Sequence, residues 1–280
     1  MTSPKACFGN FPFVRATSAV VALVFLASLS LSVIPAPASV TPRKIRSRVP
    51  FVGCASDGQL GPQPAPDGGS LLLPIPASAA RQLAYYKMAD GLSVLGPRGW
   101  HCFGAYGSDG EFLYVSSRPI ARDDIFTDEH RFAGTAIEIF DEYGGTSGRF
   151  GVAKIIARVF PAYREFTEKV IREDGDIEPA SEFPFGPFPG DKLVYRSDEL
   201  VEYETPPQTE GLGTTEKLEK NSEAIRGLEM LIGEMPEPDL ISLAVRLPRD
   251  RAGLAPIIIQ QVEREAPGGY EPDKAIPIEH

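Results

Sequence analysis

The sequence predicts an α+β protein with antiparallel hairpins in two clusters, one long, proline-interrupted helix between the clusters and a further helix near the C-terminus. Three observations predict this class. Short apolar or alternating segments come in pairs around turn residues, helical periodicity is confined to a few stretches, and neither regular strand–helix alternation nor a fixed repeat occurs. With 42% hydrophobic residues among 280, the chain has ample material for a folded core.

The N-terminal segment has the pattern of a secretory signal peptide. Lys5 and Arg15 precede an uncharged run that is most apolar over residues 19–34, and the Pro-Ala-Pro-Ala stretch ending at Ala38 provides an A-x-A cleavage site. Sixteen apolar residues are fewer than the ~20 that a membrane-spanning helix needs, so cleavage is favoured over an uncleaved anchor. We therefore expect residues 1–38 to be a signal peptide and the protein to be exported, periplasmic or secreted, meeting the membrane only transiently through this peptide.

Residues 39–48 carry four basic side chains directly after the apolar run. Exported proteins usually have more positive charge before the apolar run than after it, so this distribution is the reverse of the usual one. We interpret residues 39–48 as a flexible basic leader. Phe-Val-Gly-Cys at 51–54 looks like an acylation site, but it lies about twenty residues beyond the apolar run, which disfavours a lipoprotein. We expect a single α+β domain over 49–265, with two lobes divided at 174–191 as the alternative, and a loose tail over 266–280.

The charge of the chain is negative and unevenly distributed. Without residues 1–38 it has 26 basic and 38 acidic side chains, and residues 123–280 alone have 17 basic and 33 acidic ones. This balance argues against binding to a phosphate backbone, so nucleic acid is not an expected partner. It predicts a solvated acidic surface.

Behind a Pro- and Gly-rich stretch, the first cluster is predicted to open with a helix. Ser78 can cap this helix, and Asp90 followed by Gly91 can end it. Leu83 and Tyr86 would then share its apolar face. In order, the predicted segments are a loop or extended arm at 59–76, the helix at 78–90, a strand at 92–95, and hairpin strands at 99–106 and 111–117 around a turn at 107–110.

Residues 148–172 have the clearest helical periodicity, because apolar side chains recur there at three- and four-residue spacing. Pro161 has no N–H to donate, so it should kink or split this helix. Residues 224–232 are predicted to form a strand, which Gly227 favours over the alternative of a helix. The other predicted segments are a half-buried strand at 135–143, a Pro- and Phe-rich loop at 179–191 whose phenylalanines dock on a neighbour, a hairpin at 192–196 and 200–204, a strand at 240–247 and a helix at 254–265.

The cysteines predict one disulfide. Cys7 leaves with the signal peptide, so Cys54 and Cys102 remain in an oxidising compartment, where they are expected to pair. The alternative is a nucleophilic Cys102 activated by His101. Adjacent residues on a strand point to opposite faces, which disfavours that alternative.

Candidate catalytic residues gather in the same two segments. Each cysteine is followed by a Ser-Asp-Gly triplet, which is first of all a turn former. In the alternative interpretation, Ser56 or Ser108 is a hydroxyl nucleophile, His101 its base and Asp57 or Asp109 the orienting carboxylate of a hydrolase.

Motifs for cofactors are missing. Nucleotide-binding glycine loops, H-E-x-x-H and G-x-S-x-G do not occur, so no cofactor is expected. Three histidines and two bonded cysteines also disfavour a zinc cage.

Two acidic stretches could be considered for a metal ion. Asp174, Asp176 and Glu178 could offer carboxylates to calcium, but their spacing does not fit an EF-hand, and a solvated helix end is favoured. A second acidic group, at 123–124 and 128–130, is interpreted as a surface loop.

The segments V-P-F-V-G-C-A-S-D-G-Q-x-G at 49–61 and G-P-R-G-W-H-C-F-G at 96–104 resemble an uncharacterised family of exported bacterial proteins, with a looser likeness from 240 to 248. The resemblance implies bacterial export and a role for the segments around the two cysteines, and it implies no activity. We therefore expect a binding or cell-envelope interaction protein with an unknown partner, for example with an apolar groove lined by the phenylalanines of 183–188. A hydrolase centred on His101 is the alternative.

Overall fold

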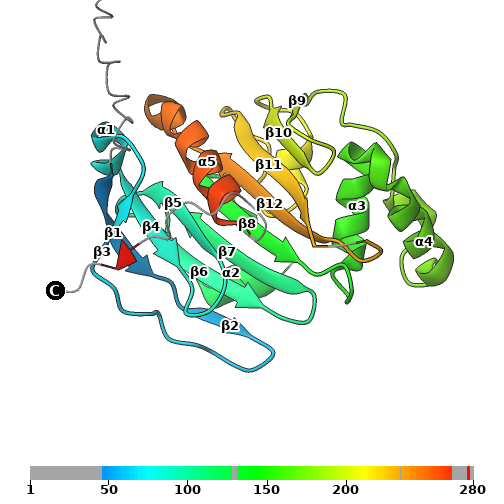
Figure 1. Ribbon diagram of the computed structural model, residues 1–280, viewed down its shortest axis with the longest axis horizontal. Helices are drawn as coiled ribbons and strands as arrows, with labels where there is room; N and C mark the ends of the chain where they lie inside the picture. The colour runs from blue at the N-terminus through cyan, green and yellow to red at the C-terminus, as the bar shows by residue number, and fades with distance from the viewer. Residues whose placement is uncertain (1–45, 128–130, 234, 267–275, 278–280) are drawn as a thin grey trace, which may run out of the picture. The chain divides into compact units, whose positions relative to one another are not determined.

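The computed structural model describes residues 46–127, 131–233, 235–266 and 276–277, and these residues form two β-sheets with helices packed on them (Figure 1). The predicted signal peptide and most of the basic leader lie outside the described residues, as does His130. Among the described residues, no helix is long and apolar enough to cross a membrane. The α+β class predicted from the sequence is confirmed.

The smaller sheet is built from the N-terminal part of the domain and a short strand of the C-terminal tail. In spatial order its strands are β13 (Ile276–Pro277), β3 (Ser70–Leu73), β1 (Ser47–Gly53), β4 (Leu83–Lys87) and β5 (Ser93–Pro97). All neighbours are antiparallel except β1 and β4, which are parallel. The predicted extended arm at 59–76 therefore contributes a strand of this sheet.

The larger sheet contains the predicted hairpins. In spatial order its strands are β2 (Ser56–Gly58), β6 (His101–Tyr106), β7 (Gly110–Ser116), β8 (Ala136–Glu142), β12 (Asp239–Arg246), β11 (Ile225–Ile232), β10 (Leu200–Thr205) and β9 (Lys192–Tyr195). Both predicted hairpins and the strands predicted at 224–232 and 240–247 are confirmed.

One face of the larger sheet is apolar. Ile139 of β8 lies opposite Leu243 of β12, which lies opposite Leu228 of β11, and all three are buried. The smaller sheet and helix α5 (Ala255–Glu265) pack on this face and form one hydrophobic core with it. A 3-10 turn, η4 (Arg249–Leu254), leads into α5, so the predicted C-terminal helix is confirmed.

The opposite face of the larger sheet is covered by the long helical segment. It consists of α3 (Arg149–Val159), a 3-10 turn η1 (Pro161–Tyr163) and α4 (Arg164–Asp174), so it splits at Pro161 as predicted. Apolar side chains of α3 form a second core with this face of the sheet, and Phe183 of the following loop docks into it. Figure 1 shows the smaller sheet and the α3–α4 pair on opposite sides of the larger sheet. The remaining short helical elements are α1 (Ala77–Ala80), α2 (Arg122–Phe126), η2 (Ala180–Glu182) and η3 (Leu212–Thr214).

The prediction of a helix at 78–90 is wrong. Only α1 is helical, and Leu83 begins strand β4, where Tyr85 pairs with Phe51 of β1 and Tyr86 with Val94 of β5. Side chains on both faces of β4 are buried, so its sequence is a continuous apolar run without strand alternation. Such a run has no periodicity that distinguishes a buried strand from a helix.

The interpretation of 135–143 as a half-buried strand is also wrong in one respect. Strand β8 is present, but Glu138 is only 1% exposed because α3 and the chain around Leu218 cover the face to which it points. The strand is therefore buried on both faces, with a carboxyl group on one of them.

Candidate functional site

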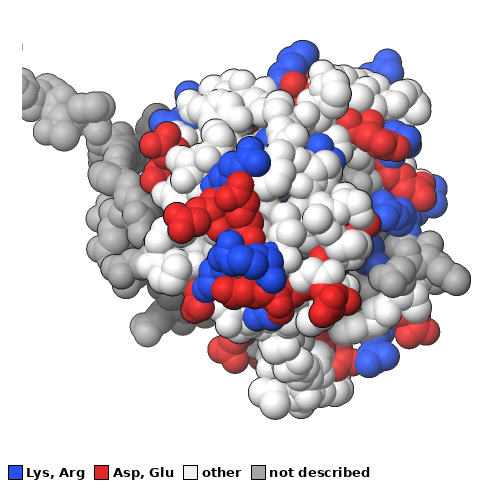
Figure 2. Space-filling view, turned by 90° about the vertical axis from the view of Figure 1, so that its right-hand side faces the viewer, with Lys and Arg blue, Asp and Glu red and all other residues white. Residues whose placement is uncertain are grey.

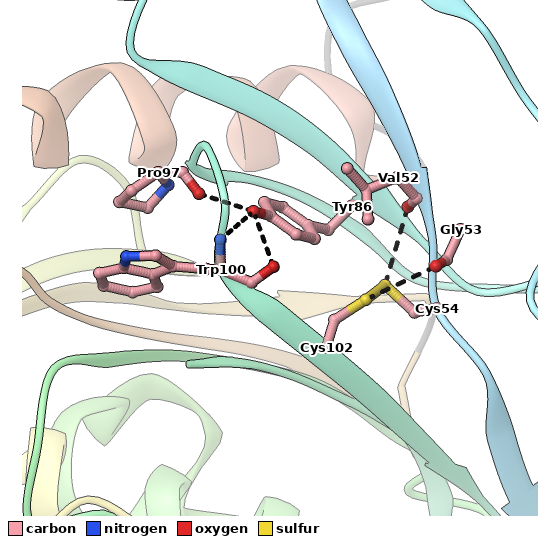
Figure 3. The surroundings of a disulfide bond; sticks show 7 residues. All are labelled: Val52, Gly53, Cys54, Tyr86, Pro97, Trp100 and Cys102. Atoms are coloured by element: carbon pink, nitrogen blue, oxygen red, sulfur yellow. Dashed lines mark hydrogen bonds between the residues drawn. A yellow bond between two sulfur atoms is a disulfide. The ribbon is translucent and has the colours of Figure 1, made fainter. Parts of the chain in front are cut away.

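The predicted disulfide is present. The Sγ atoms of Cys54 and Cys102 are bonded at 2.06 Å, and the bond joins the chain just beyond β1 to strand β6, so it links the two sheets (Figure 3). Next to it, the Tyr86 hydroxyl donates to the carbonyl of Pro97 (2.6 Å) and accepts from the N–H of Trp100 (3.1 Å). A structural disulfide is consistent with an oxidising, extracytoplasmic compartment.

The strand register separates the residues of the alternative hydrolase site. His101 opens β6 and is exposed, whereas Ser108 and Asp109 lie in the turn beyond Tyr106, at the other end of the strand. Five residues of strand correspond to about 16 Å. Ser56 pairs with Gly104, three residues from His101, which corresponds to about 10 Å along the strand.

The same residues have other partners. The Arg122 guanidinium donates to the Asp57 carboxylate, and this hydrogen bond lowers the pKa of Asp57. Gln59 donates from its side-chain amide to the Ser108 hydroxyl at 3.0 Å. A hydroxyl, an imidazole and a carboxylate therefore do not converge around His101.

Two of the three acidic residues considered for calcium are used in ion pairs. Asp174 lies 2.8 Å from the guanidinium of Arg149, and Glu178 lies 3.0 Å from the ammonium of Lys154. Asp176 is exposed at the end of α4. Within the described ranges, no group of three or more His, Cys, Asp or Glu side chains could hold a metal ion.

The structure contains a pocket that the sequence did not indicate. It has a volume of about 350 Å³ and lies between α3 and the larger sheet. Strands β8, β10, β11 and β12 form its floor, α3 forms one wall, and the rim comes from residues 181–188 and 212–216. Of the groove-lining phenylalanines predicted in 183–188, only Phe188 lines it; Phe183 is buried in the core and Phe185 is 41% exposed.

The register explains why this floor is hollow and acidic. On β12, the small side chains of Ser242 and Ala244 lie in the centre of the floor. On one side of them, β8 places Glu138 opposite Ala244; on the other side, β11 places Glu229 opposite Ser242. Because side chains directly opposite each other on neighbouring strands are in contact range, two carboxyl groups flank a trough of small residues. Glu142, two positions after Phe140 on β8, extends the same face.

Glu138 is the most unusual residue of the pocket. Its Oε1 atom is buried and finds no hydrogen-bond partner among the described residues. Its pKa is raised to about 8, chiefly by burial and further by the charge of Glu216 at the rim, while Arg246 and the backbone N–H groups of Lys217 and Leu218 act in the opposite direction. The carboxyl is therefore largely protonated at neutral pH.

Glu229 and Glu142 share this environment. Glu229 is 2% exposed and accepts a hydrogen bond from the Ser242 hydroxyl, and burial raises its pKa well above the ordinary value. Burial also raises the pKa of Glu142 to about 8. Its carboxylate lies against the backbone of Gly151 in α3, where a Cβ atom would come within 1.9 Å of Oε1. Glycine at this position lets the carboxyl group lie directly beneath the helix.

The basic side chains of the pocket wall have partners of their own. Lys154 pairs with Glu178, as described above. The Arg158 guanidinium lies 4.0 Å from the centre of the Phe188 ring and donates to the carbonyl of Gly186 at 3.3 Å. Both basic groups thus have partners outside the floor, whereas the glutamates of the floor line the cavity.

The outer surface differs from the pocket. On the face that includes α4, Figure 2 shows acidic and basic side chains lying side by side. Arg164 and Glu168, both on α4, form an exposed ion pair at 2.7 Å. Such exposed pairs are screened by water and contribute at most about 1 kcal/mol each. In the pocket, by contrast, the carboxyl groups of the floor gather on one face of the sheet.

A smaller cavity of about 220 Å³ lies on the apolar side of the larger sheet. Asp141 contributes to its lining, its Oδ1 is buried without a partner in the described part of the chain, and its pKa is raised to about 6 by burial and by the charges of Asp239 and Glu111. A neighbouring carboxylate, Glu265, is hydrogen-bonded to Tyr85. The pocket under α3 is larger and has more carboxyl groups, so we consider it the candidate functional site.

Sequence reasoning missed this site for a definite reason. Glu138 lies between Ile137 and Ile139, and Glu229 between Leu228 and Met230, which is the normal pattern of a strand with one face in water. A signal was nevertheless present. The amphipathic segment at 148–172 has to cover a sheet face, and the charged residues of that face then become buried.

Comparison of the chain with protein-family models, with curated proteins and with solved structures finds no match. The likeness of segments 49–61 and 96–104 to exported bacterial proteins stays a prediction.

Proposed function

We propose that this chain is an exported, extracytoplasmic binding protein, periplasmic or secreted, and that it holds a small polar molecule in the pocket between α3 and the larger sheet. The observation that carries this proposal is the cavity of about 350 Å³ that Glu138 lines, together with the buried Oε1 of this residue, which has no hydrogen-bond partner in the described part of the chain. A buried polar atom without a partner costs on the order of 1–3 kcal/mol, and a bound molecule that offers a hydrogen-bond donor recovers this cost.

The size and composition of the pocket support binding. Its volume falls within the range of roughly 300–1,000 Å³ that is common for small-molecule sites. The floor combines polar groups on Glu138, Glu229 and Ser242 with the apolar surface of Phe140 and Tyr203. Convergent polar groups of this kind orient a ligand, and the ring surfaces exclude water from it.

Export is supported by the disulfide and by the signal-peptide pattern of residues 1–38. A binding role is favoured over hydrolysis because the residues around His101 lie about 10 Å or more apart along β6. A partner in the cell envelope would receive or supply the bound molecule.

A blocked-pocket variant tests the proposal. We expect compounds from a library of small polar molecules to bind the wild-type protein, detected by ligand-observed NMR and by a raised melting temperature. In Gly151→Leu the new side chain occupies the space against Glu142, so this binding should be lost. Gly253→Leu is the matched control, since nothing lies within 4 Å of a Cβ at Gly253.

The proposal is contradicted if no compound binds, or if the compounds that bind the wild type bind Gly151→Leu equally well. The export part is tested separately, by N-terminal sequencing of the protein recovered from outside the cytoplasm. We expect it to begin at Ser39; an intact Met1 would contradict the predicted cleavage.

A further inference from the structure

The carboxyl groups of the pocket floor indicate what kind of molecule fits it. Glu138 and Glu229 approach the trough from opposite sides of β12, and the positions directly between them are occupied by the small residues Ser242 and Ala244. Glu142 lies on the same face, further along β8. A ligand resting on Ser242 and Ala244 therefore meets carboxyl groups on two sides.

We infer that this pocket takes a small organic cation, whose ammonium or guanidinium group lies between Glu138 and Glu229, an inference that rests on the binding function proposed above. A group with several N–H donors can donate to the carboxyl group of Glu138, whose Oε1 has no partner among the described residues, and to that of Glu229 together. Charge-assisted hydrogen bonds of this type are strong in a site from which water is excluded.

The groups around the pocket favour a cation over an anion, because its carboxyl groups become charged partners of a cation when they lose their protons. Glu138, Glu142, Glu216 and Glu229 all line it. The two basic residues of the wall are Lys154, held by Glu178, and Arg158, held by Phe188 and Gly186. An anionic ligand would have to displace one of these contacts and would still face the carboxyl groups of the floor.

A bare metal ion fits less well. Within the described residues no three His, Cys, Asp or Glu side chains are close enough together to ligate one ion. Calcium takes six to eight oxygen ligands in a close shell, whereas an ammonium group needs only two or three acceptors and brings its own carbon skeleton to fill the cavity.

Binding of a cation is coupled to release of a proton. In the free protein the Glu138 carboxyl is mainly protonated below pH 8. The groups that act on it are Glu216 at the rim, Arg246 of β12 and the backbone N–H groups of Lys217 and Leu218. When the ammonium group binds, the O–H bond of the carboxylic acid breaks, its proton passes to solvent, and the carboxylate stays with the cation. Affinity should therefore rise up to tenfold per pH unit for each released proton. The rise from Glu138 levels off above about pH 8, and Glu229, whose pKa burial also raises, adds a second proton to the dependence.

Glu142 contributes to the same pH dependence. Its pKa is also about 8; Glu216, Asp109 and Asp141 raise it, while Lys154 from α3 lowers it. A further proton is released if the cation also contacts Glu142. The number of protons released per bound molecule then reports how many floor carboxyl groups the ligand reaches.

Three probes of equal length and different charge test the inference in the full chain. They are 1,4-diaminobutane, 1,4-butanediol and succinate, with agmatine as a guanidinium probe. We expect calorimetry at pH 7.5 to show binding of the two cations, and titration in two buffers of different ionisation enthalpy to show proton release. Glu138→Gln and Glu229→Gln should each weaken binding tenfold or more.

Glu165→Gln, an exposed carboxyl on α4, is the matched control and should change the affinity less than twofold. Circular dichroism confirms that each variant is folded. Binding of butanediol or succinate in place of the cations would overturn the inference and leave the binding function standing. Cation binding that is unchanged in both pocket variants would also overturn it. If neither the cations nor any compound of the polar-compound library binds, the proposed binding function is contradicted as well.

Discussion

Replacing Glu138 by glutamine is expected to remove the contribution of this buried carboxyl group to the pH dependence of the stability of the protein. Glutamine has the shape of a protonated glutamate and cannot ionise, and its amide oxygen can still accept from the backbone N–H groups of Lys217 and Leu218. The substitution therefore isolates the ionisation of one buried carboxyl group.

The magnitude follows from the pKa difference between the folded and unfolded chain. Burial raises the folded pKa of Glu138 to about 8, and its ordinary value is 4.5. Between these values the folded state holds a proton that the unfolded state has lost, so the free energy of unfolding falls as pH rises. One pKa unit corresponds to about 1.4 kcal/mol, so the wild type loses at most about 5 kcal/mol between pH 4.5 and 8 through this group.

Urea unfolding under non-reducing conditions, followed by circular dichroism at pH 5 to 8.5, measures the effect. At pH 5 the wild type and Glu138→Gln should have similar free energies of unfolding. At pH 8.5 the variant should be more stable by several kcal/mol, up to the about 5 kcal/mol derived above. A difference between the two proteins that does not change with pH would refute the burial argument for this carboxyl.

Three further predictions concern the fold. Replacing both Cys54 and Cys102 by alanine should lower the free energy of unfolding by about 4 kcal/mol, because the bond closes a separation of 48 residues; an unchanged urea midpoint would contradict this. Leu83→Ala should cost about 2–5 kcal/mol, since Leu83 is fully buried in β4, whereas Ser78→Ala should cost under about 1 kcal/mol; a reversed order would contradict the strand assignment. Arg122→Ala should change stability by less than about 1 kcal/mol, because its side chain is 59% exposed, and a larger loss in the same assay would contradict this.

The hairpins of this fold were predictable because their information is local. In β12, Ile241, Leu243 and Val245 alternate with smaller or polar residues, and the alternation alone specifies a strand with one apolar face. The split at Pro161 is local as well, since it follows from the missing N–H of proline.

The errors arose where neighbours distant in the chain decide the outcome. Strand β4 is a strand because β1 and β5 pair with it on both sides, which the run from Leu83 to Lys87 does not reveal. His101 and Ser108 are close in sequence, yet the register of β6 and β7 places them at opposite ends of a hairpin.

The pocket could not be predicted from the sequence for the same reason, because it depends on packing between distant parts of the chain. The sequence around Glu138 is typical of a strand with a solvated face, and only the packing of α3 over that face turns an ordinary glutamate into a buried one. Its free oxygen and raised pKa are consequences of that packing, and no short motif encodes them.

The most direct test of the binding account is the titration of the Glu138 carboxyl by ¹³C NMR, with its resonance assigned by difference from Glu138→Gln. In the free protein we expect a pKa of about 8. Saturating 1,4-diaminobutane should lower that pKa, because the bound ammonium group stabilises the carboxylate. A carboxyl that titrates near its ordinary value of 4.5 in the free protein, or whose pKa does not respond to the diamine, would contradict the account.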